Sequence, residues 1–489
     1  MYFLGIDVGT SGCKTLVTDE KGHVVSSAYR QYGVLTPQPG WLELDAEMVC
    51  RKVFECIGEC AAKGIGSKIA AAAVSTQGEA IVPVSAEGKP LHNAIVTFDV
   101  RSAEDNEWFA GLVDQNHITQ ITGAPIHPMF SLSKILWLKR CRSEIYNKAH
   151  KMLCFGDFIS MRLGAAPCID YTMAARTLMF DIHKKQWDDG ILSLCGISKD
   201  MLPDAVPSGA VIGNVSAGIA DELGLNPMMS IAAGAHDQIC CALGAGVTEG
   251  GIAMDSLGTT ETILCVNQGV VITPDMAANN MPVYPYAIDG YYACCTFLSC
   301  CGSILAWFKD SLLKDGRSFA ELDGQCDSLP SPVMVLPHFA GSGTPYLDFQ
   351  SRGAIVGLTL GTTATDIYKA VIESTCFEMM INLSLMEKSG IAVNQLRSIG
   401  GGAKSPFWMQ LKADISGKPI TVMETGEAGC VGAAILAEAS LENGCNIAGL
   451  VKARTKVSGT YEPNMSRHDI YSERLEKYRF LYGALKPVL

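Results

Sequence analysis

The sequence lacks any pair of cysteines spaced as Cys-x-x-Cys, although nineteen of its 489 residues are cysteine. That spacing supplies the usual ligand pairs of structural zinc sites, so such sites are not expected. We interpret most of the cysteines as small buried apolar residues that stay reduced, which is typical of a cytoplasmic protein. A signal peptide is not expected either, because Asp7 interrupts the first apolar run and no basic segment leads into it.

Long apolar stretches and an excess of positive charge are also missing. No run of about 18 apolar residues without a charge occurs, so we expect a soluble protein with no membrane-spanning segment. The net charge of −12 argues against duplex nucleic acid or an anionic membrane as a partner, since both need a basic surface. A polyanionic substrate would have to bind together with a metal counter-ion, or at a site that is locally positive despite the negative net charge. Whether the chain forms a homodimer is left open.

The chain does have enough apolar material for more than one core. Apolar residues make up 48% of the sequence and charged residues 18%, which excludes a disordered chain, and the length favours two or three domains. Strands are predicted over 2–6, 14–18 and 69–75, and helices over 46–63 and 364–387. This alternation indicates an α/β fold with a central mixed sheet.

Two segments far apart in the chain resemble each other. Gly9-Thr10-Ser11 aligns with Gly258-Thr259-Thr260, and apolar strands flank both. The alignment places Asp7 opposite Ser256, so only the first copy has a carboxylate beside its turn. Short Gly-Thr turns also arise by chance, which stays open as the alternative to an ancient duplication. A duplication would divide the chain into a domain of 1–246 and one of 247–489.

Both turns have the composition of a phosphate-binding loop. Gly9 lets a phosphate approach the backbone N–H groups, and Thr10 and Ser11 add hydroxyl donors. Lys14 would supply a point charge, and Asp7 would hold a hydrated Mg²⁺. The alternative for this turn alone is a plain hairpin with a capping aspartate. Two such turns would clamp opposite sides of one phosphate chain.

Asp237 stands between an apolar strand predicted over 229–233 and a helix of small residues over 239–244. A carboxylate at such a junction is well placed to act as a general base, taking a proton from a hydroxyl that attacks phosphorus. The alternative role for Asp237 is an N-cap of the helix. Gln238 would then bind a substrate hydroxyl, and we interpret His236 as a packed histidine.

A glycine-rich turn joins a short apolar strand to a helix predicted over 407–416. Such a turn lets an adenine or ribose lie close to the backbone, and the helix N-terminus favours negative charge. The turn is neither a Walker motif nor GxGxxG, which excludes the standard P-loop and dinucleotide-binding interpretations. The candidate nucleotide contacts in it are Gly401, Gly402, Ala403 and Ser405.

A further polar group follows the predicted strand over 69–75. Gln77 and Glu79 come directly after it, where side chains can point into a cleft, and Asp99 and Arg101 come later in the chain. The alternative is a turn of solvated polar residues.

In this order, these motifs resemble the FGGY family of carbohydrate kinases, within the superfamily of sugar kinases, Hsp70 and actin. The resemblance covers nearly the whole chain. It is strongest over Gly400-Gly401-Gly402-Ala403-Lys404-Ser405-Pro406-Phe407-Trp408, and the other segments that carry it are 3–11, 93–101, 234–238, 256–259 and 353–361.

The resemblance implies two ribonuclease-H-like domains, with ATP and a sugar meeting in the cleft between them. It also implies that Asp237 is the catalytic base and that Asp7 and Asp237 lie beside Mg²⁺. The candidate contacts to phosphate and nucleotide are then Gly9, Thr10, Ser11, Lys14, Gly258, Thr259, Thr260, Gly302, Gly401, Gly402, Ala403 and Ser405. The candidate contacts to the substrate are Gln77, Gly78, Glu79, Asp99 and Gln238.

The motifs mix two substrate patterns of this family. Xylulokinases usually carry Met-His where this chain has Gly78-Glu79, and glycerol kinases carry Arg-Glu. Gln238 resembles the glycerol kinase pattern, while residues 400–408 look more like a xylulokinase. Glu79 would accept hydrogen bonds from vicinal hydroxyls, and Gly78 would leave room for a substrate larger than glycerol. We expect a ketopentose such as xylulose, with a glycerol- or tetritol-type polyol as the alternative.

Two rival functions fit parts of the pattern. An ATP-gated chaperone of the Hsp70 type would need a peptide-binding domain, and the chain after Asp469 is too short for one. A catalytically silent sugar sensor stays open, although no DNA-binding segment precedes Phe3, which disfavours a repressor. The sequence thus predicts a carbohydrate kinase that uses ATP and Mg²⁺, and ATP turnover with and without sugars would separate it from both rivals.

Overall fold

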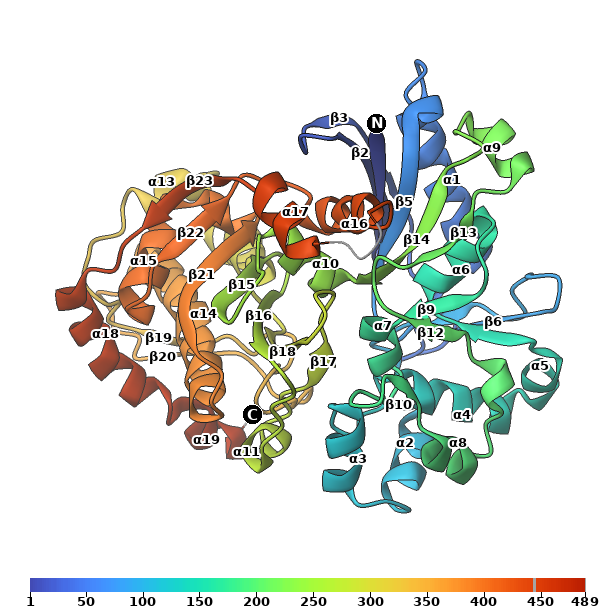
Figure 1. Ribbon diagram of the computed structural model, residues 1–489. Coiled ribbons are helices and arrows are strands. Elements are labelled where there is room, and N and C mark those ends of the chain that lie inside the picture. Colours follow the sequence, from blue (N-terminus) through green and yellow to red (C-terminus); the bar gives the residue numbers. More distant parts are fainter. Residues whose placement is uncertain (443–445, 489) are drawn as a thin grey trace. The chain divides into compact units, whose positions relative to one another are not determined.

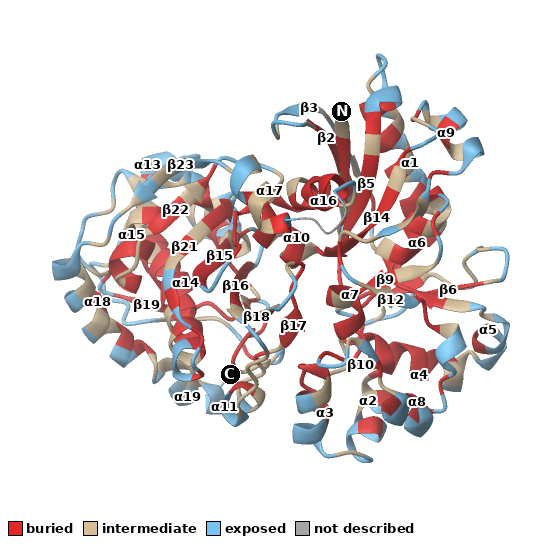
Figure 2. Cartoon of the chain, viewed as in Figure 1, coloured by how far each residue is buried: buried red, intermediate tan, exposed pale blue. Residues whose placement is uncertain are grey.

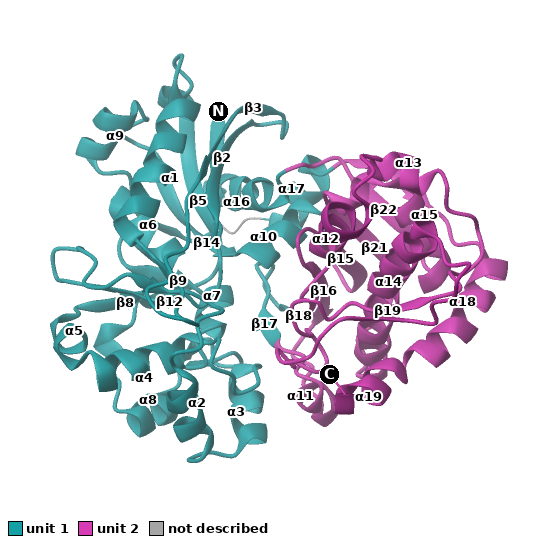
Figure 3. Ribbon diagram, turned by 180° about the vertical axis from the view of Figure 1, so that it is seen from behind, with its two compact units in different colours: residues 1–248, 283–293, 427–455 teal, residues 249–282, 294–426, 456–489 magenta. Residues whose placement is uncertain are grey.

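The computed structural model describes residues 1–442 and 446–488 (Figure 1). Contacts divide the chain into two compact units (Figure 3). The first consists of Met1–Thr248, Val283–Ala293 and Glu427–Thr455, and the second of Glu249–Pro282, Cys294–Gly426 and Lys456–Leu489. The chain first leaves the first unit at Thr248, close to the expected division after residue 246, and it returns twice. The division of the sequence into domains of 1–246 and 247–489 stays a prediction.

The first unit is built on a six-stranded sheet. Three neighbouring strands in its centre are parallel, and the strands outside them are antiparallel to their neighbours. The residues of the three parallel strands are almost all buried, as Figure 2 shows. The order across the sheet is β13 (Val211–Asn214), β14 (Ser230–His236), β5 (Ile69–Thr76), β1 (Tyr2–Val8), β2 (Gly12–Asp19) and β3 (Val24–Gln31).

The second unit repeats this arrangement. Its two central parallel pairs are β15 with β21 and β21 with β22, and antiparallel partners stand on either side. The sheet has one more strand than that of the first unit, and its order is β17 (Val283–Pro285), β18 (Tyr291–Leu298), β16 (Glu261–Gln268), β15 (Gly251–Leu257), β21 (Val393–Gly400), β22 (Ile420–Met423) and β23 (Val457–Tyr461). The turn between β15 and β16 therefore corresponds to the turn between β1 and β2. The expected α/β fold of two related units is confirmed.

The helices that the sequence predicts are found close to their expected bounds. The helix expected over 46–63 is α1, Ala46–Ala61, and Asp45 caps it by accepting a hydrogen bond from the Met48 N–H at 3.0 Å. The other helices of the first unit are α2 (Ala103–Ala110), α3 (Gln115–Thr122), α4 (Ser131–Cys141), α5 (Ser143–Lys148), α6 (Phe155–Leu163), α7 (Tyr171–Ala175), α8 (Asp189–Cys195), α9 (Ala217–Leu223), α10 (Asp237–Gly244), α16 (Ala428–Ala439) and α17 (Ile447–Arg454). Those of the second are α11 (Pro274–Ala278), α12 (Gly302–Trp307), α13 (Phe319–Asp323), α14 (Ala364–Lys388), α15 (Pro406–Ser416), α18 (Met465–Tyr478) and α19 (Leu481–Leu485).

Helix α16 comes from late in the chain but packs in the first unit, on β1 and α10 (Figures 1 and 3). Glycines make this contact close. A Cβ atom at Gly5 of β1 would lie 1.9 Å from the Cys430 carbonyl oxygen, and one at Gly432 would lie 2.0 Å from that of Cys240. Any side chain at either position would push backbone from backbone, so both positions require glycine.

The eighteen cysteines that the structure describes are all free, and most are buried, as expected from the sequence. Cys445 lies outside the described residues. Over 1–442 and 446–488, no helix combines the length and apolar character needed to cross a membrane.

Candidate active site

The parallel strands β1, β5 and β14 bring the main candidates of the first unit to one edge of its sheet. Asp7 of β1 pairs with Ser75 of β5, and His236 of β14 pairs with Thr76 of β5. The residues just beyond these pairs, which include Asp237, therefore emerge side by side. The carboxyl ends of parallel strands are where α/β proteins bind their ligands.

Asp7 lies within β1 rather than in the turn where the sequence analysis placed it. The strand continues to Val8 because Asp7 and Val8 pair with strands on both sides. The Ser75 hydroxyl donates a 2.7 Å hydrogen bond to Asp7 Oδ1. Burial raises the pKa of Asp7, while the bond from Ser75 and the charge of Lys14 act in the opposite direction.

The turn after β1 is tight and is supported from β5. The Gly9 N–H donates to the Gly12 carbonyl at 3.0 Å. The Gln77 amide group accepts from the Thr10 hydroxyl at 2.9 Å and donates to the Gly9 carbonyl at 3.2 Å. In this structure Gln77 therefore holds the turn, and its contact with substrate stays a prediction.

Lys14 does not stand alone beside this turn. Its Nζ lies 2.6 Å from Glu427 Oε2, and the two side chains are 39% and 42% exposed. An exposed ion pair of this kind is weak, so the ammonium group can exchange its partner for a phosphate at little cost. Ser11 is exposed at the tip of the turn.

Asp237 is the first residue of α10, with the N-cap position taken by His236. Its side chain is 29% exposed, and Oδ1 is buried with no hydrogen-bond donor among the described residues. Burial and the charge of Asp7 raise the pKa of Asp237 to about 7, against the charge of Arg176. A carboxylate poised near neutrality and open to a ligand has the properties of a general base. The alternative role of Asp237 as N-cap is not what the helix uses.

His236 packs against Asp237 without forming an ion pair with it. His236 Nε2 lies 3.2 Å from Asp237 Oδ1. Burial, together with the charge of Arg176, holds the pKa of His236 well below its usual value, so the ring is neutral. This agrees with its interpretation as a packed histidine.

Glu79 is buried and held by contacts that the sequence analysis missed. Its φ of 63° is unusual for a residue with a side chain, and such a conformation persists only where neighbours fix it. Arg176, at the end of α7, forms an ion pair with Glu79, and the Thr97 hydroxyl donates to Glu79 Oε2 at 2.9 Å. Arg176 was not recognisable because it lies far from Glu79 in sequence and in no motif that we singled out.

Gly78 does not leave free space for a larger substrate, contrary to our expectation. A Cβ atom there would lie 2.9 Å from Arg176 Nε and 3.0 Å from His236 Nε2. These two side chains fill the volume that a residue with a side chain would use. Arg176 and His236, not residue 78, thus shape this part of the site.

Asp99 is buried and has both carboxylate oxygens engaged. Arg101 donates to both oxygens, through Nε at 2.8 and 2.9 Å, and the Leu42 N–H donates to Oδ2 at 2.5 Å. Arg101 also binds Glu43 at 2.7 Å and stacks on Trp41 at 4.0 Å. Asp99 therefore belongs to a closed polar network, and its contact with substrate stays a prediction.

In the second unit, the Gly258-Thr259-Thr260 turn is brought together with Gly302. The Gly302 N–H donates to the Gly258 carbonyl at 2.9 Å, and the Ser303 hydroxyl donates to the Thr259 carbonyl at 2.9 Å. A Cβ atom at Gly302 would lie 2.7 Å from the Gly258 oxygen. The start of α12 is thus fastened to the exposed turn, and glycine is needed for this approach.

The glycine-rich turn follows β21, the strand that pairs with β15. Gly401 is exposed, and apart from Gly401 itself and its two chain neighbours no described residue has an atom within 4 Å of a Cβ placed on it. Gly402 instead packs on Leu257 and Trp408, and Ala403 is buried. Gly401 is therefore the position of this turn that is open to a flat ligand.

Ser405 is the N-cap of α15, and its hydroxyl is already used twice. It accepts from the Trp408 N–H at 3.0 Å and donates to Asp323 Oδ2 at 2.7 Å. Asp323 also accepts from the Tyr368 hydroxyl at 2.7 Å. Asp323 was missed by the sequence analysis, and it ties the glycine-rich turn to α13 and α14.

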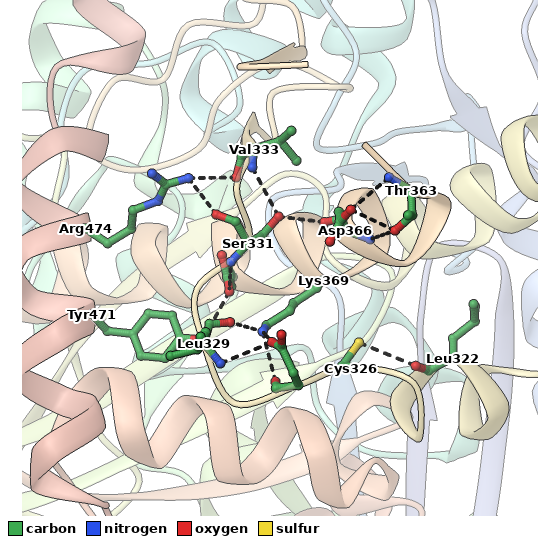
Figure 4. Close-up of polar contacts among 12 residues, drawn as sticks. Leu322, Cys326, Leu329, Ser331, Val333, Thr363, Asp366, Lys369, Tyr471 and Arg474 are labelled. Atoms are coloured by element: carbon green, nitrogen blue, oxygen red, sulfur yellow. Dashed lines mark hydrogen bonds and ion pairs between the residues drawn. The ribbon is translucent and has the colours of Figure 1, made fainter. Parts of the chain in front are cut away.

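The segment after Asp323 is anchored in turn, as Figure 4 shows. Lys369 of α14 lies 2.6 Å from Asp327 Oδ1 and also donates to the Leu329 carbonyl. Arg474 of α18 donates to the Ser331 carbonyl at 2.8 Å. These contacts hold residues 327–331, which follow Asp323 in the chain, against α14 and α18.

A buried charged group lies beneath the turn of the second unit. Lys412 Nζ is 2.8 Å from Asp255 Oδ2 and 2.5 Å from Glu261 Oε1, and all three side chains are at most 2% exposed. Burial alone would lower the pKa of Lys412, but the two carboxylates outweigh it and hold that pKa above its usual value. Asp255 and Glu261 lie on the two strands that lead into and out of the Gly258 turn, so Lys412 joins them.

Known proteins match this chain along almost its whole length. The N-terminal domain of the FGGY family of carbohydrate kinases matches residues 2–244, and the C-terminal domain of that family matches 253–441. The chain is 31% identical to a xylulose kinase from Staphylococcus epidermidis (99% of this chain, 97% of the relative) and 32% identical to a glycerol kinase from Bacillus velezensis (100% and 98%). A solved structure, ligand-bound xylulose kinase from Lactobacillus acidophilus, superimposes with a TM-score of 0.93 at 26% identity, covering 100% of this chain and 99% of that one.

Proposed function

Because this chain belongs to the FGGY family of carbohydrate kinases, and is therefore an ATP-dependent carbohydrate kinase, we propose that it phosphorylates a primary hydroxyl of a ketopentose such as xylulose. The observation that carries the proposal is Asp237, a partly exposed carboxylate with a pKa of about 7 at the sheet edge that also presents Asp7 and Glu79. Support for the ketopentose comes from full-length similarity to xylulose kinases.

The proposed reaction begins when Asp237 takes the proton of the bound hydroxyl. The resulting oxygen forms a bond to the γ-phosphorus of ATP as the bond to the β–γ bridging oxygen breaks, and ADP leaves with that electron pair. The proton stays on Asp237 until it passes to solvent through the exposed part of the side chain. A positioned general base of this kind contributes about 10²–10⁴-fold to the rate.

Each unit would hold a different part of the substrates. In the first unit, the N–H groups and hydroxyls of 9–11 would meet the transferring phosphate, with Lys14 as a supporting charge. In the second unit, the exposed turn at 258–260 with Gly302 would hold phosphates, and Gly401 would leave room for the nucleoside. Ser405 would act through the conformation of its turn, since its hydroxyl is bonded to Asp323.

The residues present fit a magnesium ion. Asp7 and Asp237 lie close enough that the charge of one raises the pKa of the other, a repulsion that a cation would relieve. Mg²⁺ is commonly held by one or two carboxylates together with substrate phosphates, and the described residues contain no group of three ligands that would hold it alone. When bound, Mg²⁺ would neutralise charge on the phosphates.

The polar groups that would bind the sugar are Glu79 and Gln238. Among the described residues no donor satisfies the buried Gln238 Oε1, so it is available to a substrate hydroxyl. Glu79 and Gln238 also match the glycerol kinase pattern, and glycerol kinases are among the relatives. A glycerol- or tetritol-type polyol is therefore the second candidate substrate.

A screen of ADP release tests the substrate proposal. We expect turnover with D-xylulose and related pentuloses to exceed turnover with glycerol, tetritols, hexuloses and aldonates by at least about tenfold in kcat/KM, which is about 1.4 kcal/mol. Turnover that is fastest with glycerol or a tetritol would select the second candidate. ADP release that no sugar or polyol accelerates would reject both.

The elevated pKa of Asp237 predicts a titration near neutrality. In the protein free of nucleotide and metal, ¹³C NMR of the Asp237 carboxyl should give a pKa of about 7. Because the negative charge of Asp7 favours the protonated form, Asp7→Asn should move this pKa downward, and loss of the Arg176 charge would move it upward. The Asp237→Asn variant identifies the resonance, and a pKa near 4 in the wild type would contradict the prediction.

A further inference from the structure

Helix α7 contacts two parts of the first unit's site: the end of β14, next to Asp237, and Glu79. It begins after Asp170, a buried carboxylate that accepts from the N–H groups of Thr172 and Met173 at 2.8 and 3.2 Å. These bonds fix the first turn of the helix. The residue after its last turn is Arg176.

The first contact is to the strand that carries the base. The Thr172 hydroxyl accepts from the backbone N–H of His236 at 2.8 Å and donates to Asp170 Oδ1 at 2.5 Å. Thr172, Asp170 and His236 are all at least nine-tenths buried. The Ala235–His236 peptide, one residue before Asp237, is thus tied by a side chain of α7 at the point where β14 ends.

The second contact is to the carboxylate proposed to bind substrate. Arg176 forms the ion pair with Glu79, and its guanidinium also donates to the Tyr284 hydroxyl and lies 4.8 Å from the Tyr284 ring centre. Arg176 is buried, so its contacts with Glu79 and Tyr284 restrict where its guanidinium can lie. The two contacts of α7 are only four positions apart in sequence.

We propose that α7 is a positioning element that sets the distance between the base Asp237 and the substrate-binding Glu79, through Thr172 on one side and Arg176 on the other. This inference rests on the proposed function. Thr172 and Arg176 touch neither the transferred phosphate nor the attacking hydroxyl in it. Because the distance between base and substrate anchor decides which hydroxyl faces Asp237, α7 determines the position of phosphorylation as well as its rate.

Thr172→Val tests the first contact, since valine keeps the shape and removes the hydroxyl. A shift of the base by a fraction of an ångström to about 1 Å can cost up to about 10²-fold in rate. We expect kcat with D-xylulose to fall about 10- to 100-fold, with KM for ATP unchanged within about twofold. Thr172→Ser, which restores the hydroxyl, should recover most of the activity. Thr122→Val is the matched control, because Thr122 is equally buried and its hydroxyl also bonds backbone groups, in α3.

Arg176→Lys tests the second contact, since lysine keeps the charge and loses the planar guanidinium. We expect KM for D-xylulose to rise at least about tenfold, with a smaller change in kcat, whereas Thr172→Val is expected to act mainly on kcat. A product phosphorylated at more than one hydroxyl, seen by ³¹P NMR, is the further expected result. Equal kinetic changes in both variants, or none, would overturn the inference.

Crystal structures of wild type and Thr172→Val give a readout that does not depend on turnover. A displaced Asp237 carboxylate supports the role of Thr172, and an unmoved one with wild-type kcat rejects it. If the wild type phosphorylates no sugar or polyol, the proposed function fails, and the displacement alone still shows whether α7 positions Asp237.

Discussion

Asp237→Asn is expected to lower kcat by about 10²–10⁴-fold, because asparagine keeps the shape of the side chain but cannot accept the proton. Nucleotide affinity should stay within about twofold of wild type, since the proposed nucleotide contacts belong to other segments, at 258–260, 302 and 401. Coupled ADP release measures the first quantity and isothermal titration with ADP the second.

The same variant should fold at least as well as the wild type. Burial and the charge of Asp7 raise the pKa of Asp237, so the ionised form is the one that the folded state disfavours at pH 7. A neutral amide removes that unfavourable charge, so the variant gains stability where it loses activity. Such a trade-off between stability and activity is common at functional sites. Asp189→Asn is the matched control, because Asp189 is 78% exposed in the same unit, and its kcat should equal that of the wild type. Near-normal turnover in Asp237→Asn would reject the assignment of the base.

Lys412→Met is expected to destabilise the protein by about 3–5 kcal/mol. The change leaves Asp255 and Glu261 buried without their cation, and an unpaired buried charge is far more costly than the pair. Because both carboxylates flank the Gly258 turn, the loss should also weaken ADP binding. Urea denaturation followed by tryptophan fluorescence measures the stability.

An exposed ion pair supplies the control for this prediction. Lys199 lies 3.0 Å from Asp189, and the two side chains are 51% and 78% exposed. Lys199→Met removes the same chemical group from solvent-screened surroundings and should cost less than about 1 kcal/mol. Equal losses in Lys412→Met and Lys199→Met would show that burial does not set the cost.

The architecture was largely predictable from the sequence because its signals are local. Apolar runs beside a Gly-Thr turn predicted the hairpin of β1 and β2, and the long helix expected over 364–387 is α14 at Ala364–Lys388. The end of β1 was placed too early. The residues around Asp7 are typical of a turn, but Asp7 pairs with β2 on one side and β5 on the other, and this pairing keeps it in the strand.

The supports of the site could not be found in the same way. Glu79 was a candidate, but its partner Arg176 lies almost one hundred residues later, and Asp323 approaches Ser405 from an equally remote segment. Folding brings the members of such pairs together, and their spacing in a single sequence does not indicate that they will meet. The prediction for Gly78 was wrong for a related reason. A glycine suggests empty space beside it, but in the folded chain Arg176 and His236 occupy that space.

The origin of α16 bears on how the protein is made. The strand β1 is translated long before the helix that packs against its Gly5, because that helix consists of residues 428–439. Until then, the surface of β1 and α10 that α16 covers is exposed, and transiently exposed apolar surface of this kind favours aggregation. Expression of residues 1–248 alone should accordingly yield insoluble material, and supplying 427–455 as a separate peptide should improve its recovery.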